Sequence, residues 1–187
     1  MTSKREVFIS IDVETSGPIP GEYSLLSIGA CDVDDVTRVF SCELQPINGN
    51  ADPKALEISG FSLEQLAKTG TPPKQAMIAF AAWIQSIVRE TDTPVFVGFN
   101  APFDWSFINY YFHKFLGRNP FGFAALDIKA YYMGATGCSW RETRSSAVDT
   151  KLKPAQKLDH NALHDAQYQA ELFRIIRKKV ASRPSNV

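Results

Sequence analysis

Apolar and polar residues alternate over three short stretches near the start of the chain. Residues 6–14 are apolar, β-branched and partly alternating, and a Ser-Gly-Pro turn follows at residues 16–18, which is typical of a strand that ends in a turn. Two similar stretches occupy residues 25–33 and 38–44, with an acidic turn between them. Three closely spaced strands joined by short turns predict an antiparallel meander.

After residue 53 the pattern changes, and helical spacing alternates with short strand-like stretches. Helices are predicted over residues 62–68, 73–89, 105–115 and about 161–180. Strands are predicted over residues 94–100 and around 125–128, whereas residues 134–157 are predicted to be mostly loop. Three strands, followed by helices that alternate with two more strands, predict an α/β domain with a mixed sheet.

Length and composition favour a globular protein. The chain has 187 residues, of which 44% are hydrophobic and 21% are charged, so we expect a single domain over residues 1–187 with a core of about residues 6–180. No apolar stretch approaches the ~18 residues that cross a membrane, and the first residues do not resemble a signal peptide. Because the three cysteines are too few and too scattered for a disulfide framework, we expect a cytoplasmic location.

Two acidic residues, Asp12 and Glu14, lie at the end of the first predicted strand. Because the side chains of a strand alternate between its faces, both carboxylates project from one face. Other acid pairs with this spacing in the chain look like solvated turn residues, so the spacing alone leaves a structural role open. The preceding residues are apolar enough for a central strand, however, where charged side chains need a partner or a metal ion.

Asp104 and Asp165 are each predicted to lie in the first turn of a helix. Asp104 lies among aromatic residues, and it is either an acid that complements the helix dipole or a desolvated carboxylate that needs a cation. Asp165 lies on the side of the apolar stripe of the last helix, and Asp159 is the candidate N-cap of that helix.

The four acids therefore appear at the ends or first turns of elements around one sheet. Oxygen ligands without cysteine favour magnesium or manganese over zinc. Two such ions form the clamp that is used for displacement at a phosphodiester. A nearby histidine would supply the general base that deprotonates the attacking water.

Three motifs connect these residues to a known family. They are D-V-E-T-S-G at residues 12–17, N-A-P-F-D-W-S-F at residues 100–107 and H-N-A-L-H-D-A at residues 160–166. In this order and at these separations they resemble the DEDDh 3′→5′ exonucleases, the DnaQ-like proofreading family of the ribonuclease H-like superfamily. The resemblance spans about residues 6–176.

The resemblance implies a ribonuclease H-like mixed five-stranded sheet flanked by helices, with the second strand antiparallel to its neighbours. It implies a metal-dependent 3′–5′ exonuclease that releases nucleoside 5′-monophosphates from nucleic acid, DNA or RNA, with a free 3′ end, and we expect single strands as its substrate. Two Mg²⁺ or Mn²⁺ ions would be held by Asp12, Glu14, Asp104 and Asp165.

The resemblance also selects the general base. The family's histidine precedes the last Asp by five residues, which is His160, and His164 is expected to be exposed. A related class has a tyrosine four residues before that Asp, but Asn161 occupies the position here. The third histidine, His113, is expected to be partly buried and structural.

Contacts to the terminal nucleotide are implied for Thr15, Ile58 and Phe103, although for Ile58 and Phe103 a packing role is equally consistent with the sequence. Ser59 and Gly60 stand where family members often have His-Gly, a departure that concerns the nucleotide pocket. Asp127 matches a position that relatives often fill with Asp, outside the metal set.

Charge is balanced overall, with 20 basic and 20 acidic residues, which argues against unspecific coating of nucleic acid. Two basic segments stand out. Residues 141–157 have a local excess of positive charge and lead into His160, so we expect them to contact phosphates. The basic tail from residue 174 onward is interpreted as a solvated helix face.

Two other functions are compatible with parts of the pattern. A nucleic-acid-binding module without catalytic activity is expected to lack one of the acids or the histidine, yet all five are present. A phosphatase with an aspartyl nucleophile is expected to have Asp rather than Glu at position 14, together with a later lysine and acidic pair.

Overall fold

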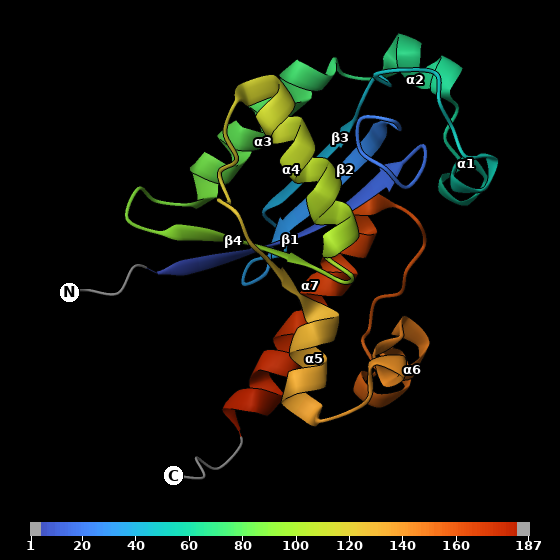
Figure 1. Cartoon of the computed structure of the whole chain (residues 1–187). Helices are drawn as coiled ribbons and strands as arrows, with labels where there is room; N and C mark the ends of the chain where they lie inside the picture. Colours follow the sequence, from blue (N-terminus) through green and yellow to red (C-terminus); the bar gives the residue numbers. More distant parts are fainter. Residues whose placement is uncertain (1–4, 183–187) are drawn as a thin grey trace.

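The computed structural model describes residues 5–182, which form a five-stranded sheet with helices on both faces (Figure 1). The strands are β1 (Glu6–Thr15), β2 (Leu25–Asp32), β3 (Val39–Glu43), β4 (Thr93–Gly98) and β5 (Ala125–Asp127), in the order β3-β2-β1-β4-β5. Strand β2 is antiparallel to β1 and β3, whereas β4 is parallel to β1 and β5. The predicted mixed sheet and antiparallel second strand are confirmed.

The helices are α1 (Pro53–Ser59), α2 (Leu63–Thr69), α3 (Pro73–Ile87), α4 (Pro102–Leu116), α5 (Ile128–Thr136), α6 (Ser145–Leu152) and α7 (Ala162–Ala181), with a 3-10 turn η1 (Trp140–Thr143). The loop predicted over residues 134–157 is wrong, because η1 and α6 lie within it. Helix α6 buries only Val148 and Leu152, so its sequence lacks the apolar stripe that predicts a helix. Helix α1 was likewise not predicted; Asp52 caps its start and no residue in it is buried.

Alternate residues of β1 face two different cores. Val7, Ile9, Ile11 and Val13 pack in the core that α3 and α4 cover, with Phe80 and Phe107. Phe8 faces the second core instead, where Tyr168 and Phe173 of α7 lie. Since side chains alternate along a strand, Asp12 and Glu14 project on the α7 side of the sheet.

Gly29 of β2 allows α7 to begin close against the sheet. It is the cross-strand partner of Asp12, and a Cβ atom on Gly29 would lie 2.0 Å from the backbone carbon of Ala162, the first residue of α7. Any side chain here would push the helix start away. The missing side chain therefore brings the first turn of α7, which contains Asp165, next to Asp12.

Two local predictions are wrong. The N-cap of α7 is Asn161 rather than Asp159: the Asn161 side chain accepts the N–H groups of Leu163 and His164, while Asp159 accepts the N–H of Asn161. His113 is exposed near the end of α4 rather than partly buried.

Among residues 5–182, no helix combines the length and the apolar character that crossing a bilayer requires. The cytoplasmic location remains a prediction from the sequence.

Candidate active site

Asp12 and Glu14 project from the last third of β1 and are partly buried. Asp12 contacts α7 directly, because the Gln169 side-chain amide donates to Asp12 Oδ1 at 2.6 Å. The same Gln169 accepts the backbone N–H of Phe99, just after β4, through its Oε1 at 2.8 Å. One side chain therefore connects the first acid to both α7 and the end of β4.

Asp104 reaches the sheet from the first turn of α4 and is only 5% exposed. The pairing of β1 with β4 ends at Ser10, so within residues 5–182 β1 has no strand partner on that side farther on. The backbone N–H of Val13 instead donates to Asp104 Oδ1 at 3.1 Å. This bond places Asp104 between the neighbouring acids Asp12 and Glu14 along the strand.

Asp165 lies one turn into α7, is 4% exposed, and accepts the backbone N–H of Asp159 through its Oδ1 at 3.0 Å. That bond folds the preceding segment back over the start of α7. His160 lies within the folded segment with a positive φ of 60°, and a non-glycine residue with positive φ is uncommon. The backbone therefore holds His160 in a turn beside Asp165.

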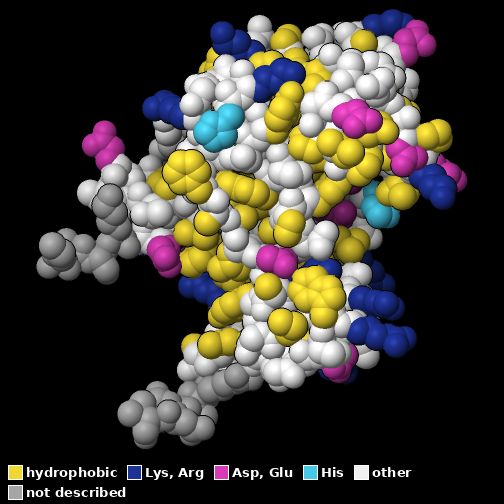
Figure 2. All heavy atoms as spheres, in the orientation of Figure 1, with side chains coloured by type: hydrophobic (Ala, Val, Ile, Leu, Met, Phe, Trp, Pro, Cys, Tyr) yellow, Lys and Arg dark blue, Asp and Glu magenta, His cyan; other side chains and the backbone are white. Residues whose placement is uncertain are grey.

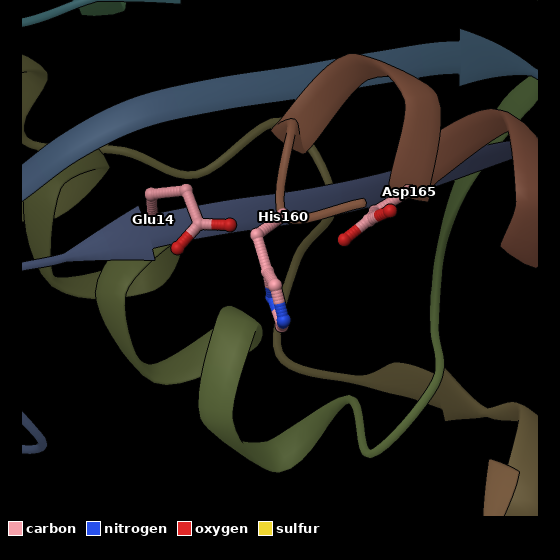
Figure 3. Close-up of side chains that lie close together, drawn as sticks. All are labelled: Glu14, His160 and Asp165. Atoms are coloured by element: carbon pink, nitrogen blue, oxygen red, sulfur yellow. The ribbon is translucent and has the colours of Figure 1, made fainter. Parts of the chain in front are cut away.

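The His160 ring and two of the acids meet in one place. Glu14, His160 and Asp165 each offer a ligand atom within 4.8 Å of the others. Figure 3 shows the three side chains directed into the same space, Glu14 from the sheet, His160 from the segment before α7 and Asp165 from the first turn of α7. His164 points elsewhere, with its Nδ1 2.8 Å from Asp159 Oδ2, and it is exposed as expected.

Burial and mutual repulsion raise the pKa values of these acids. Burial raises the pKa of Asp12 well above its usual range, and the charges of the other three acids raise it further. Burial also raises the pKa of Asp104, against the Val13 N–H bond that lowers it. The pKa of Glu14 is raised to about 7 by burial and by the charge of Asp165. Burial likewise raises the pKa of Asp165, and the charge of Asp159 adds to the effect.

A cleft of about 250 Å³ contains all five residues. Its lining consists of Asp12, Val13, Glu14, Phe99, Asn100, Phe103, Asp104, Leu158, His160, Asp165 and Gln169. No lysine or arginine is among these described lining residues. The clustered carboxylates therefore have oxygen ligands to offer and no lysine or arginine in the described lining to neutralise them, a donor set that fits hard divalent cations.

The residues expected to contact substrate lie in different surroundings. Phe103 lines the cleft. Thr15 is buried, and its Oγ1 donates to the carbonyl of Gly17 at 2.9 Å. Ile58 is 57% exposed on α1 and does not line the described cleft.

Gln169, Asn100 and Leu158 line the cleft but were not singled out from the sequence. Gln169 lies four residues after Asp165, and this spacing places both on one helix face. The sequence could therefore have indicated Gln169 as a cleft residue through its position relative to Asp165. Asp127 lies outside the cleft lining. Its Oδ1 caps α5 by accepting the N–H of Lys129 and also accepts the N–H of Asn100 at 3.0 Å.

The strand order, the four acids and the adjacent histidine define a ribonuclease H-like 3′–5′ exonuclease of the DEDDh class. Residues 7–177 match the model of the family described as the 3′-5′ exoribonuclease Rv2179c-like domain, and the chain belongs to this family. The exonuclease prediction is confirmed, and both alternatives raised by the sequence are disfavoured.

Similar proteins agree with this assignment. The chain is 58% identical over 178 residues to the 3′-5′ DNA exonuclease Cap18 of Escherichia coli, covering 95% of each chain. It is 27% identical to ribonuclease T of Shewanella frigidimarina, covering 90% of this chain and 80% of that protein. The nuclease domain of 3′hExo, a DEDDh family member bound to rAMP, superposes with a TM-score of 0.73 at 14% identity, covering 95% of each chain.

Proposed function

We propose that this protein removes nucleotides from the 3′ end of single-stranded DNA and releases nucleoside 5′-monophosphates. The observation that carries the proposal is the convergence of four carboxylates and one imidazole on a single cleft. Membership of the DEDDh class implies divalent metal ions and a nucleic acid substrate. The name of the 58% identical relative favours DNA over RNA, although the family description favours RNA.

Asp12, Glu14, Asp104 and Asp165 would hold two magnesium or manganese ions. The raised pKa values of these acids support this role, because a cation would relieve the repulsion that burial intensifies. When bound, such ions offset the negative charge that builds up on a phosphate under attack. Gln169 would orient Asp12, since its amide already donates to Oδ1 of that carboxylate.

His160 would act as the general base. Its ring lies beside Glu14 and Asp165, and its side chain is exposed on a segment between two helices, where a water molecule and a phosphodiester can both approach. An imidazole is able to accept a proton from water near neutral pH, which a lysine ammonium cannot do. The two carboxylates beside it would stabilise the imidazolium that results.

The terminal nucleotide would contact Phe103, Thr15 and Ile58. Phe103 forms part of the cleft wall, and Thr15 follows Glu14 directly on β1. Ile58 exposes an apolar side chain on α1, which is available to pack against a base.

The experiment compares DNA and RNA oligonucleotides of one sequence, each labelled at the 5′ end and supplied with Mg²⁺ or Mn²⁺. We expect a ladder that shortens from the 3′ end of single-stranded DNA, and little cleavage when the 3′ hydroxyl is blocked by phosphate. The Asp104→Asn variant and excess EDTA serve as inactive controls. Preferred digestion of RNA would show that RNA rather than DNA is the substrate. Rapid cutting of circular DNA would contradict cleavage from a 3′ end, and full activity in EDTA would contradict the metal-dependent mechanism.

A further inference from the structure

Trp140 is placed differently from the other two tryptophans of the chain. Trp83 and Trp105 pack against the core that α3 and α4 cover. Trp140, the first residue of η1, is 52% exposed and belongs to neither core among the described residues. The exposed part of this apolar surface gains nothing from the hydrophobic effect in the folded chain, so packing alone does not explain its position.

Lys129 connects Trp140 to the catalytic cleft. Its Nζ lies 4.4 Å from the centroid of the Trp140 ring, and the same Nζ donates to Asn100 Oδ1 at 3.3 Å. Asn100 lines the cleft beside the acids. The Trp140 indole and Asn100 of the cleft wall therefore contact the same ammonium group. Lys129 covers part of the Trp140 ring, and about half of the surface of Trp140 stays exposed.

The turn that contains Trp140 is firmly fixed. Ser139 and Glu142 form a reciprocal capping box around η1, and Lys151 Nζ pairs with the other oxygen of Glu142 at 3.1 Å. The buried Thr143 donates its hydroxyl to the Trp140 carbonyl at 2.7 Å. A large exposed aromatic on a fixed turn is preordered for a contact, because little conformational entropy remains to be lost.

The surface around Trp140 has the charge that a nucleic acid requires. Arg141 within η1 and Arg144 directly after it are exposed. Lys153 and Lys157 are exposed on the segment after α6. Figure 2 shows lysine and arginine side chains gathered beside hydrophobic ones at the lower right of this face, where Figure 1 has α6. Leu158, at 42% exposure, adds an apolar lip to the cleft.

We propose that Trp140 is a stacking platform for an unpaired base of the substrate strand, upstream of the nucleotide in the cleft. This inference rests on the proposed exonuclease function and deepens it, because it names a source of single-strand preference. Aromatic side chains in a positively charged surface bind single strands by stacking, which every base permits. A base inside a duplex has both faces occupied and cannot use the platform.

The test compares Trp140→Ala with Trp140→Phe and with Ile78→Ala, which removes a similarly exposed apolar side chain from α3. With a single-stranded decamer, we expect kcat/KM of Trp140→Ala to fall about 5- to 100-fold, mostly through KM, as expected for loss of one stacked base. Trp140→Phe keeps most of the activity and Ile78→Ala all of it. With the p-nitrophenyl ester of thymidine 5′-monophosphate, which has no upstream base, Trp140→Ala loses less than twofold.

A second arm replaces single upstream bases of the decamer by abasic residues. At one position the wild type should lose as much as Trp140→Ala loses on the intact strand, and the variant should lose nothing more there. Equal losses in both proteins at every position would overturn the stacking proposal. So would an equal effect of Trp140→Ala on decamer and ester, which would assign Trp140 to the fold. A wild type that digests no oligonucleotide would instead contradict the exonuclease function itself.

Discussion

The carboxylates and the histidine meet in one cleft, but two different kinds of structure hold them. Asp12 lies on a central strand, and Asp104 and Asp165 lie in the first turns of α4 and α7. His160 lies between α6 and α7, on a segment attached at separate points. One of these is Glu171, whose carboxylate accepts the N–H groups of Ala155 and Gln156 at 2.8 and 3.1 Å.

This difference follows from the charges. Like charges close together in a poorly solvated place repel strongly, so a carboxylate cluster persists only where regular elements with their own cores fix it. A proton acceptor that must reach substrate needs the opposite, an exposed and less confined position. Substitution of a carboxylate should therefore change both the activity and the stability of the metal-free protein. Substitution of His160 should change the activity alone.

The largest loss is expected from Asp12→Asn and Asp104→Asn. Each variant keeps the size of the side chain and its hydrogen bonds but removes one of the charges proposed to bind metal, a contribution of several kcal/mol at the transition state. We expect kcat to fall at least about 10⁴-fold. The melting temperature of the metal-free protein should not fall, because a repulsive charge has been removed.

Exposed Glu90→Gln is the matched control and should keep wild-type activity. Digestion of labelled single strands and a thermal melt in EDTA together check the prediction. An Asp104→Asn variant with more than a few per cent of wild-type turnover would show that Asp104 is not a ligand.

The next effect concerns the histidine. His160→Ala removes the proposed general base, a contribution of about 10²–10⁴-fold, so kcat should fall by that factor while KM and metal-dependent stabilisation change little. His164→Ala is the internal control, since it removes only an exposed contact to Asp159. Digestion rates of both variants on labelled single strands, measured over a range of substrate concentrations, separate kcat from KM. If His164→Ala proves the inactive variant, the assignment of the base is wrong.

The parts of the molecule differ in how far the sequence alone predicts them. The acids on β1 and at the helix starts were predictable, because strand alternation and helix position place them without knowledge of distant contacts. Helix α6 was not, because it is held by tertiary contacts such as the hydrogen bond from the Tyr168 hydroxyl to Asp149 rather than by an apolar stripe. The close approach of α7 at Gly29 depends on pairing between distant elements.

Within the site, the role of Gln169 was likewise not predictable from the sequence. A neutral amide on a helix has no distinctive sequence pattern, and its importance is visible only once α7 lies against β1 and the end of β4. Asp159 was misassigned as the N-cap because capping depends on backbone conformation, which favours Asn161 two residues later.

A smaller effect is expected from the basic residues near His160. Lys153 and Lys157 are exposed, whereas Lys151 pairs with Glu142 and so braces η1. Each phosphate contact contributes about 0.7 to the log–log salt slope of single-strand binding. Replacing Lys153 and Lys157 by Gln should therefore lower that slope by about 1.4 and leave kcat at saturating substrate nearly unchanged.

Lys178→Gln with Lys179→Gln, at the far end of α7, removes the same charge from the basic tail and provides the control. Fluorescence anisotropy with a labelled strand, measured over a range of salt concentrations, reports the slope. Equal slopes for the two double variants would show that the segment with Lys153 and Lys157 does not contact the nucleic acid strand.

The smallest effect is a change in stability that depends on pH and reports on the carboxylate cluster without any substrate. The pKa of Glu14 is raised from its usual 4.5 to about 7 in the folded protein, first by burial and then by the charge of Asp165. Between these two values the folded state holds more protons than the unfolded state, so this group lowers the free energy of unfolding as pH rises from 4.5 to about 7. Glu14→Gln should therefore match the metal-free wild type in stability below pH 4.5 and exceed it by about 1–2 kcal/mol near pH 8, less than the full shift because Glu14 keeps some contact with solvent.

Urea unfolding in EDTA at several pH values measures the difference. Addition of Mg²⁺ or Mn²⁺ should reverse its sign, since the cation stabilises four carboxylates more than three; a variant that stays more stable in saturating metal would place Glu14 outside the metal site.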